Sequence, residues 1–419
     1  MATTALAACG VVPNGKASAQ AQAGADATVW RVYGDELVAG APQGRLTGMR
    51  VAVKDLFAVQ GQVAGAGNGA WLAEQATPAK RSAPAVQRLL DAGATVVGMA
   101  RTDEFAYSLA GTNGHYGTPP NPAAPDRISG GSSSGSAAAV ALGQADIGLG
   151  TDTGGSIRIP SSYQGLWGMR PTHGVVSVQG LLPLAPSFDT VGWMARDANT
   201  LQRAGDALLP RAEAEPLQRM VLAPALFALA DAPLAALLRQ ALAGWQAPLP
   251  ALQEIAWDTG VLPDWVKAFQ MRQGVEAWRA HGPWISANWA TLNPDVKSRF
   301  QAASRYTAQD LASADSVLAQ ARTRINAMLG DAVLVLPSAS SFAPLRTDAA
   351  MSGAVVEAAR ASTFQLTCLA GITGRCAISV PVATKGQPPA GLCLVGPRGR
   401  DRDLLRLANS LVLQGVAVG

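Results

Sequence analysis

The sequence predicts an α/β fold in which parallel strands alternate with helices. Residues 49–54 and 95–99 are short runs with β-branched apolar centres, which predict two buried strands. A helix start at Ser82-Ala83-Pro84 lies between these two runs. Strand, helix and strand in this order favour parallel pairing through a right-handed crossover.

The helix between these strands has its own start and stop signals. Ser82 supplies a capping hydroxyl, and Pro84 suits the first helical turn. Leu89 and Leu90 provide an apolar face, and Gly93 ends the helix. We therefore expect this helix to cover one face of the sheet.

The remaining elements extend the same pattern to the C-terminus. The sequence predicts a small-residue helix at 136–142, strands at 147–150, 332–336, 376–380 and 392–395, and a terminal helix at 401–413. Because strands of one sheet occur at both ends of the chain, we expect a single α/β domain over 29–419 with a helical insertion at about 200–330. The chain has no detectable internal repeat.

Tryptophans are spaced through the insertion, and we favour core packing over a role as a ligand wall for Trp257, Trp265, Trp278, Trp284 and Trp289.

Composition excludes several classes of protein. The 419 residues are 48% hydrophobic and 15% charged, which is typical of a soluble protein with a large core. The net charge of +4 comes from scattered arginines, and the densest cluster, 397–403, alternates acids with bases, so nucleic acid is not an expected partner. The four cysteines and three histidines show no metal-ligand spacing, and we expect no metal and no cofactor. No stretch is long and apolar enough to span a membrane.

Residues 1–28 are low in complexity and predict a disordered tail. Leu6-Ala7-Ala8-Cys9 resembles a lipoprotein cleavage box and Ala17-Ser18-Ala19 a signal cleavage site, yet no basic residue precedes Lys16. We therefore expect a cytoplasmic protein. The alternative is an exported or lipid-anchored protein whose true start lies upstream of Met1.

Two glycine-glycine-serine turns lie at the ends of predicted elements and place Ser132 and Ser156 in backbone with few side chains. Such turns let backbone N–H groups approach an anion or an oxyanion closely. A phosphate cradle is not favoured, because neither GxxxxGK[ST] nor GxGxxG is present. Residues 131–135 formally match the G-x-S-x-G elbow with Ser133 as nucleophile, but no strand precedes them.

A serine nucleophile needs a base, and three residues are candidates. His115 and His173 both lie in turn-rich loops, where a structural histidine is the more common role. Lys54 ends an apolar strand, where desolvation would lower the pKa of its ammonium group. From composition alone, a strand-end lysine paired with Asp55 or another acid remains the favoured interpretation.

Three blocks resemble the amidase signature family of serine hydrolases, in the family's order: 51–55 (VAVKD), 130–137 (GGSSSGSA) and 150–160 (GTDTGGSIRIP). The 24-residue spacing between Ser132 and Ser156 also fits the family. Residues 389–392 and 394–396 extend the similarity, so that it covers nearly all of the chain from about residue 45. Ser134 and Tyr163-Gln164-Gly165 depart from the commonest pattern without touching the catalytic positions.

The resemblance implies a mixed, largely parallel central sheet flanked by helices on both faces. It also implies a Ser-cisSer-Lys triad, with Ser156 as the nucleophile that forms an acyl-enzyme, Lys54 as the neutral general base and Ser132 as the proton bridge. The oxyanion hole would be formed by the backbone N–H groups of Thr153, Gly154, Gly155 and Ser156.

Three further blocks look most like the plant-type indole-3-acetamide hydrolases: 103–108, 115–119 and 187–192. The resemblance therefore implies an amidase that converts a small or aryl-substituted primary amide to carboxylate and ammonia. Two alternatives remain: a catalytically inert, amidase-like docking module and a glutamine-amidotransferase-type subunit. The resemblance leaves a homodimer open.

Overall fold

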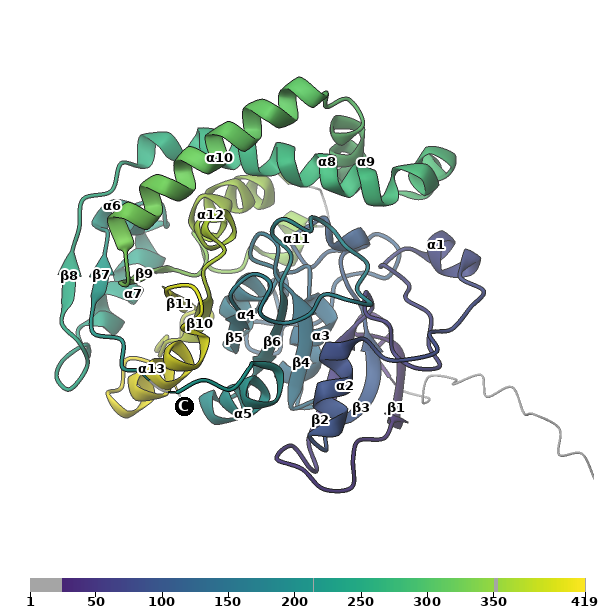
Figure 1. Ribbon diagram of the computed structural model, residues 1–419, viewed down its shortest axis with the longest axis horizontal. Coiled ribbons are helices and arrows are strands. Elements are labelled where there is room, and N and C mark those ends of the chain that lie inside the picture. The colour runs from purple at the N-terminus through teal and green to yellow at the C-terminus, as the bar shows by residue number, and fades with distance from the viewer. Residues whose placement is uncertain (1–24, 214, 350–352, 419) are drawn as a thin grey trace, which may run out of the picture.

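The computed structural model describes residues 25–213, 215–349 and 353–418, so most of the predicted tail lies outside the described residues. Within these ranges, eleven strands form one sheet in the order β1-β3-β2-β4-β6-β5-β10-β11-β9-β7-β8. Helices cover both of its faces (Figure 1). The mixed α/β class predicted from the sequence is confirmed.

The strands are β1 (Trp30–Val38), β2 (Arg50–Lys54), β3 (Thr95–Ala100), β4 (Ile147–Thr151), β5 (Trp167–Arg170), β6 (Val191–Ala195), β7 (Met220–Leu222), β8 (Leu252–Glu254), β9 (Val333–Pro337), β10 (Ala377–Pro381) and β11 (Gly391–Val395). The helices are α1 (Gly69–Glu74), α2 (Pro84–Asp91), α3 (Ser134–Ala141), α4 (Arg158–Gln164), α5 (Ala198–Leu208), α6 (Pro224–Phe227), α7 (Ala232–Leu242), α8 (Leu262–Asn288), α9 (Pro294–Ala303), α10 (Ala308–Leu329), α11 (Arg346–Ala349), α12 (Ala354–Thr373) and α13 (Asp401–Leu413). Three short 3₁₀ helices are η1 (Glu104–Ala106), η2 (Thr259–Val261) and η3 (Trp289–Thr291).

The sheet is less parallel than the resemblance implied. Strands β3, β2 and β4 pair in parallel, as expected from the strand-helix-strand order, and β9, β7 and β8 form a second parallel group. The six other pairings are antiparallel. The connections from β5 to β6 and from β10 to β11 are loops without a crossover helix, and such connections favour antiparallel neighbours.

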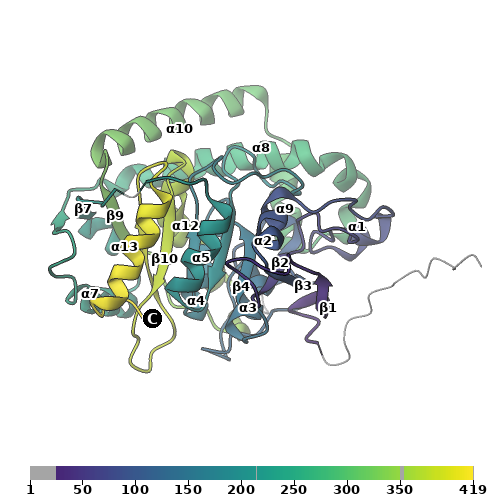
Figure 2. The same cartoon turned by 60° about the horizontal axis from the view of Figure 1, so that its bottom comes forward.

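Both faces of the sheet are buried, and successive residues of a strand pack against opposite helical layers. Val51 and Val53 of β2 face the helical layer of α2, α5 and α13, whereas Ala52 faces α3. Figure 2 shows α2, α5 and α13 together on the face turned toward the viewer. A strand buried on both sides reads as a continuous apolar run, which explains why β2 was predictable.

Helix α2 begins at Pro84, as predicted, but the predicted cap is wrong. Ala83 occupies the N-cap position without a side-chain bond, and Ser82 Oγ instead accepts a hydrogen bond from the Gln60 N–H. Gly93, with a φ of 95°, follows the helix and permits the left-handed backbone there.

The segment predicted as a helical insertion contains α8, α9 and α10, but also the two short strands β7 and β8, which extend the sheet at one edge. Helices α8 and α10 run side by side along the top of Figure 1. The five tryptophans named from the sequence pack into or against hydrophobic clusters, as predicted. Within the described ranges, no helix combines the length and apolarity needed to cross a membrane.

Candidate active site

The loop that presents Ser156 connects the end of β4 to the start of α4 and is organised by Asp152. The Asp152 carboxylate accepts hydrogen bonds from the backbone N–H groups of Gly155 (3.1 Å) and Ile157 (3.1 Å). These bonds satisfy donors at the start of α4 that have no partner within the helix. The turn therefore has a fixed shape before any substrate arrives.

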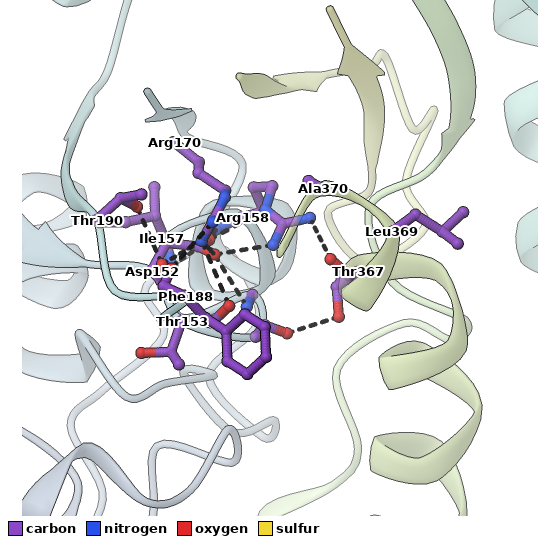
Figure 3. A network of polar contacts seen from close by, with 12 residues as sticks. Asp152, Thr153, Ile157, Arg158, Arg170, Phe188, Thr190, Thr367, Leu369 and Ala370 are labelled. Carbon is purple, nitrogen blue, oxygen red and sulfur yellow. Dashed lines mark hydrogen bonds and ion pairs between the residues drawn. The ribbon is translucent and has the colours of Figure 1, made fainter. Parts of the chain in front are cut away.

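Two buried arginines hold Asp152 in turn (Figure 3). Arg158 Nη2 lies 2.8 Å and Arg170 Nη1 lies 3.0 Å from Asp152 Oδ1, and all three side chains are fully buried. Burial alone would raise the pKa of Asp152, but the two guanidinium charges outweigh it and hold this pKa well below its usual range. The carboxylate is therefore charged throughout the neutral range.

Helix α12 is tied to the same loop through Thr367. The Thr367 hydroxyl donates to the carbonyl oxygen of Gly154 at 2.6 Å, and its own carbonyl accepts a hydrogen bond from Arg158 at 3.0 Å. Phe364 of the same helix packs so closely on Gly154 that a Cβ there would lie 2.5 Å from the Phe364 ring. This contact explains why residue 154 lacks a side chain.

The second glycine turn leads into α3 and carries Ser132. The peptide bond between Gly131 and Ser132 is cis, as the resemblance implied. A Cβ at Gly131 would lie 2.4 Å from Asp103 Oδ2. Asp103 is itself held by the Gly111 N–H (3.0 Å) and by Ser134 Oγ (3.1 Å), so the turn packs directly on a fixed carboxyl group.

Lys54 lies at the end of β2 and contacts both neighbouring elements. Its Nζ is 2.8 Å from Ser132 Oγ and 2.8 Å from Thr151 Oγ1, and the side chain is fully buried. Burial lowers the pKa of Lys54 to about 7, although the charges of Asp103 and Asp189 partly oppose the shift. At neutral pH a large fraction of this amine is therefore unprotonated.

Asp55, the next residue, faces away from Lys54. Its carboxylate lies 2.8 Å from Arg31 Nε and accepts a hydrogen bond from the Gly65 N–H at 3.0 Å. Successive side chains of a strand point to opposite faces, which accounts for this separation. The pairing of Lys54 with Asp55, favoured from composition alone, is therefore wrong.

Ser156 lines a cavity of about 290 Å³, at the lower end of the size range for small-molecule sites. Thr153 and Gly154 line it as well, and its opposite wall comes from α8, α9 and α12. The Ser156 carbonyl accepts a hydrogen bond from the Ser133 N–H at 3.3 Å, which joins the two glycine turns. In the described part of the chain, no hydrogen bond joins the Ser132 and Ser156 hydroxyls.

The four predicted oxyanion donors are not equivalent. The Gly155 N–H already donates to Asp152, whereas the N–H groups of Thr153, Gly154 and Ser156 have no partner among the described residues. The N–H group of Ser156 and those of two residues just before it are therefore available to bind a ligand oxygen.

The other residues considered from the sequence lie elsewhere. Ser133 Oγ donates to the Thr151 carbonyl at 3.2 Å and does not line the cavity. His115 Nε2 lies 2.8 Å from Glu104, and His173 Nε2 lies 2.8 Å from the Pro186 carbonyl. Neither histidine contacts Ser132 or Ser156, so their geometry does not support a role as base.

Several site residues were missed from the sequence. Thr151, the second partner of Lys54, follows a predicted strand, and its hydroxyl at the strand end was the available signal. Arg299 and Arg360 line the cavity but come from helices far along the chain. No local pattern distinguishes them from surface arginines of amphipathic helices.

Comparison with known proteins identifies the class. A family model described as amidase matches residues 16–229. The chain is 37% identical over 399 residues to Amidase 1 of Arabidopsis thaliana, with 87% of this chain and 93% of the relative covered. It is 32% identical over 394 residues to chloroplastic outer envelope protein 64 of the same plant, covering 87% and 66%. A solved structure described as an amidase matches with a TM-score of 0.79 at 28% identity, covering 89% and 86%.

The chain therefore belongs to the amidase signature family. It is an amide hydrolase that acts on C–N bonds.

Proposed function

We propose that this protein hydrolyses small or aryl-substituted primary amides, with Ser156 as nucleophile, Lys54 as base and Ser132 as the hydroxyl between them. The observation that carries the proposal is the 2.8 Å contact between Lys54 Nζ and Ser132 Oγ, made by a fully buried lysine. A lysine with a pKa of about 7 accepts a proton at neutral pH, which an ordinary lysine does not.

In the first step, Ser156 Oγ forms a bond to the carbonyl carbon of the amide. The Ser156 proton passes to Ser132 Oγ, and the Ser132 proton passes to Lys54 Nζ. The carbonyl π electrons move to oxygen, and the free N–H groups of Thr153, Gly154 and Ser156 stabilise the resulting oxyanion.

In the second step, the C–N bond breaks and Lys54 returns the proton through Ser132 to the leaving nitrogen, which departs as ammonia. Water then attacks the acyl carbon and passes a proton through Ser132 to Lys54. The bond to Ser156 Oγ breaks, and Lys54 returns this proton through Ser132 to Ser156 Oγ. The products are the carboxylate and free Ser156.

The proposed substrate size rests on the cavity. A volume of about 290 Å³ suits a single ring or a short chain. The cavity wall includes Leu109, Leu184 and Phe364, which favour an apolar or aromatic body behind the amide. The resemblance of residues 103–108, 115–119 and 187–192 to indole-3-acetamide hydrolases supports this size class.

The test measures ammonia release from a panel of primary amides, together with covalent labelling by a serine-directed phosphonate. Ser156→Ala should lose both signals, with turnover falling about 10³-fold or more. Ser133→Ala is the matched control. It removes a buried hydroxyl from the other glycine turn, and the variant should still be labelled. Labelling that survives in Ser156→Ala but not in Ser133→Ala would favour the G-x-S-x-G elbow. A wild-type protein with neither signal would favour the docking module.

A further inference from the structure

The cavity that contains Ser156 carries charge of one sign. Among the described residues that line it, only Arg299 and Arg360 are charged, and no acidic side chain lines it. The remaining polar lining is neutral and includes Gln273 and Tyr306. A wholly neutral substrate would leave these two guanidinium groups without a role in recognition.

Arg360 lies one helical turn from the nucleophile loop. Arg360 and Phe364 are four residues apart on α12 and therefore share one face of the helix. Phe364 packs on Gly154, two residues before Ser156. Four residues of helix rise about 6 Å, so Arg360 is displaced by about this distance along α12 from the reacting end of the cavity.

The two arginines differ in how their charges are compensated. Arg299 is fixed in the framework: it donates to the Tyr107 carbonyl and lies 3.0 Å from Asp295 and 3.5 Å from Glu357. Arg360 has Glu357 as its single ion-pair partner in the described structure, at 3.0 Å from Nε. The Glu357 side chain is 48% exposed and shared between both arginines.

The environment of Arg360 is correspondingly short of negative charge. Burial, followed by the neighbouring charge of Arg299, lowers the pKa of Arg360, and the opposing charges of Glu357 and Asp295 do not fully offset this. A carboxylate bound in the cavity would supply the missing charge and suit the planar guanidinium, which binds carboxylates in a bidentate manner.

We propose that the substrate is a primary amide that carries a carboxylate at its far end, and that Arg360 binds this carboxylate in exchange for Glu357. This inference rests on the proposed function of the same cavity. The substrate class comprises monoamides of short or aromatic dicarboxylic acids. In a para-substituted aromatic monoamide, the carboxylate and the amide are about one helical turn apart.

The test compares two amides of the same shape, 4-carbamoylbenzoate and 4-nitrobenzamide, whose carboxylate and nitro groups are isosteric. Calorimetry with the Ser156→Ala protein measures binding without turnover. We expect Arg360→Gln to weaken 4-carbamoylbenzoate about 10- to 100-fold relative to 4-nitrobenzamide. Arg324→Gln is the control, because Arg324 lines a separate groove between α8 and α10.

Glu357→Gln tests the exchange of partners. Removal of this counter-ion should strengthen binding of 4-carbamoylbenzoate and leave 4-nitrobenzamide less affected. A purely structural role of Arg360 would weaken both ligands equally, and that result would overturn the inference. The inference would also fail if the Ser156→Ala protein, with Arg360 and Glu357 intact, did not bind 4-carbamoylbenzoate more tightly than 4-nitrobenzamide. Since binding is measured in a variant without the nucleophile, these outcomes are separate from loss of ammonia release, which tests the proposed function.

Discussion

At the scale of single residues, burial controls the chemistry of Lys54. Its amine contacts two hydroxyls, Ser132 and Thr151, and no carboxylate of the described residues is hydrogen-bonded to it. Hydroxyls stabilise the ammonium form less than a carboxylate would, so the desolvation of the charge dominates. The orientation of Asp55 toward Arg31 is part of this arrangement, because a carboxylate facing Lys54 would raise its pKa.

The pH dependence of kcat/KM should report the Lys54 amine. The protonated form cannot accept a proton from Ser132, so kcat/KM should be low in acid, rise through a single ionisation at about pH 7 and level off above it. A pH–rate profile with a neutral amide measures this. Lys54→Met should lose several orders of magnitude in rate.

Controls are needed because this value is close to the ordinary pKa of histidine. His115→Gln and His173→Gln should keep the ascending limb, and its loss in either variant would assign the base to that histidine.

The pH dependence of stability is a second readout of the Lys54 pKa. Since the folded-state pKa of Lys54 is below its ordinary 10.5, the unfolded chain binds more protons between about pH 7 and 10.5. Lys54 therefore makes the free energy of unfolding rise with pH in that window.

Sequence predicted the polar residues that occur in local motifs and missed those that meet across the fold. Lys54 was recognisable because a lysine that ends an apolar strand is uncommon. Arg360 was not, because its helix carries other charged residues and only the packing of α12 on Gly154 brings it to the cavity. Its significance depends on the lack of acidic side chains among the described residues that line the cavity, which is a property of tertiary structure.

At the scale of elements, the turn between β4 and α4 depends on a buried ion cluster. Asp152 accepts a hydrogen bond from the N–H of Ile157, the residue before α4, and is the counter-ion of Arg158 and Arg170. A buried charge cluster contributes little net stability against an apolar replacement, but removal of one partner leaves the others uncompensated. The cluster therefore fixes geometry at the nucleophile.

Asp152→Asn keeps the size of the side chain and removes its charge. Two buried guanidinium groups would lose their counter-ion, so we expect the free energy of unfolding to fall by about 3–5 kcal/mol. Urea denaturation at pH 7 measures it. Asp146→Asn is the matched control, since Asp146 pairs with Arg50 and Arg196 at the surface and should cost about 1 kcal/mol or less. Equal losses in both variants would contradict the assigned role.

Element predictions succeeded where the pattern was local. The terminal helix at 401–413 and the parallel pairing of β2 with β3 are both confirmed. The share of parallel strands was overestimated, because the central strands are joined by loops whose composition does not reveal strand direction. The capping role of Ser82 failed because its hydroxyl was taken by the Gln60 N–H from another segment.

At the scale of the whole molecule, the cavity is assembled from segments far apart in the chain. The nucleophile loop follows a central strand, whereas the opposite wall comes from α8, α9 and α12. An aromatic cluster connects these parts. The Phe269 ring of α8 stacks on Phe188, with centroids 3.8 Å apart, and meets Phe364 of α12 edge-on at 5.1 Å.

Phe269→Ala should therefore affect both stability and catalysis. Phe269 is fully buried, and its truncation should lower the free energy of unfolding by about 3–5 kcal/mol. Because Phe364 packs on Gly154 and also lines the cavity, loss of its neighbour should loosen the wall beside Ser156 and lower kcat/KM. Urea denaturation and steady-state kinetics, the latter under conditions where the variant is folded, measure the two effects.

Phe227→Ala separates these effects. Phe227 of α6 is equally buried, but it belongs to the hydrophobic cluster on the other face of the sheet and does not line the cavity. Its truncation should cost a similar free energy of unfolding while kcat/KM of the folded enzyme stays near the wild-type value. If both variants lowered kcat/KM in proportion to their loss of stability, the aromatic cluster would serve only general packing. A selective loss in Phe269→Ala would show that α8 acts on the site through Phe364.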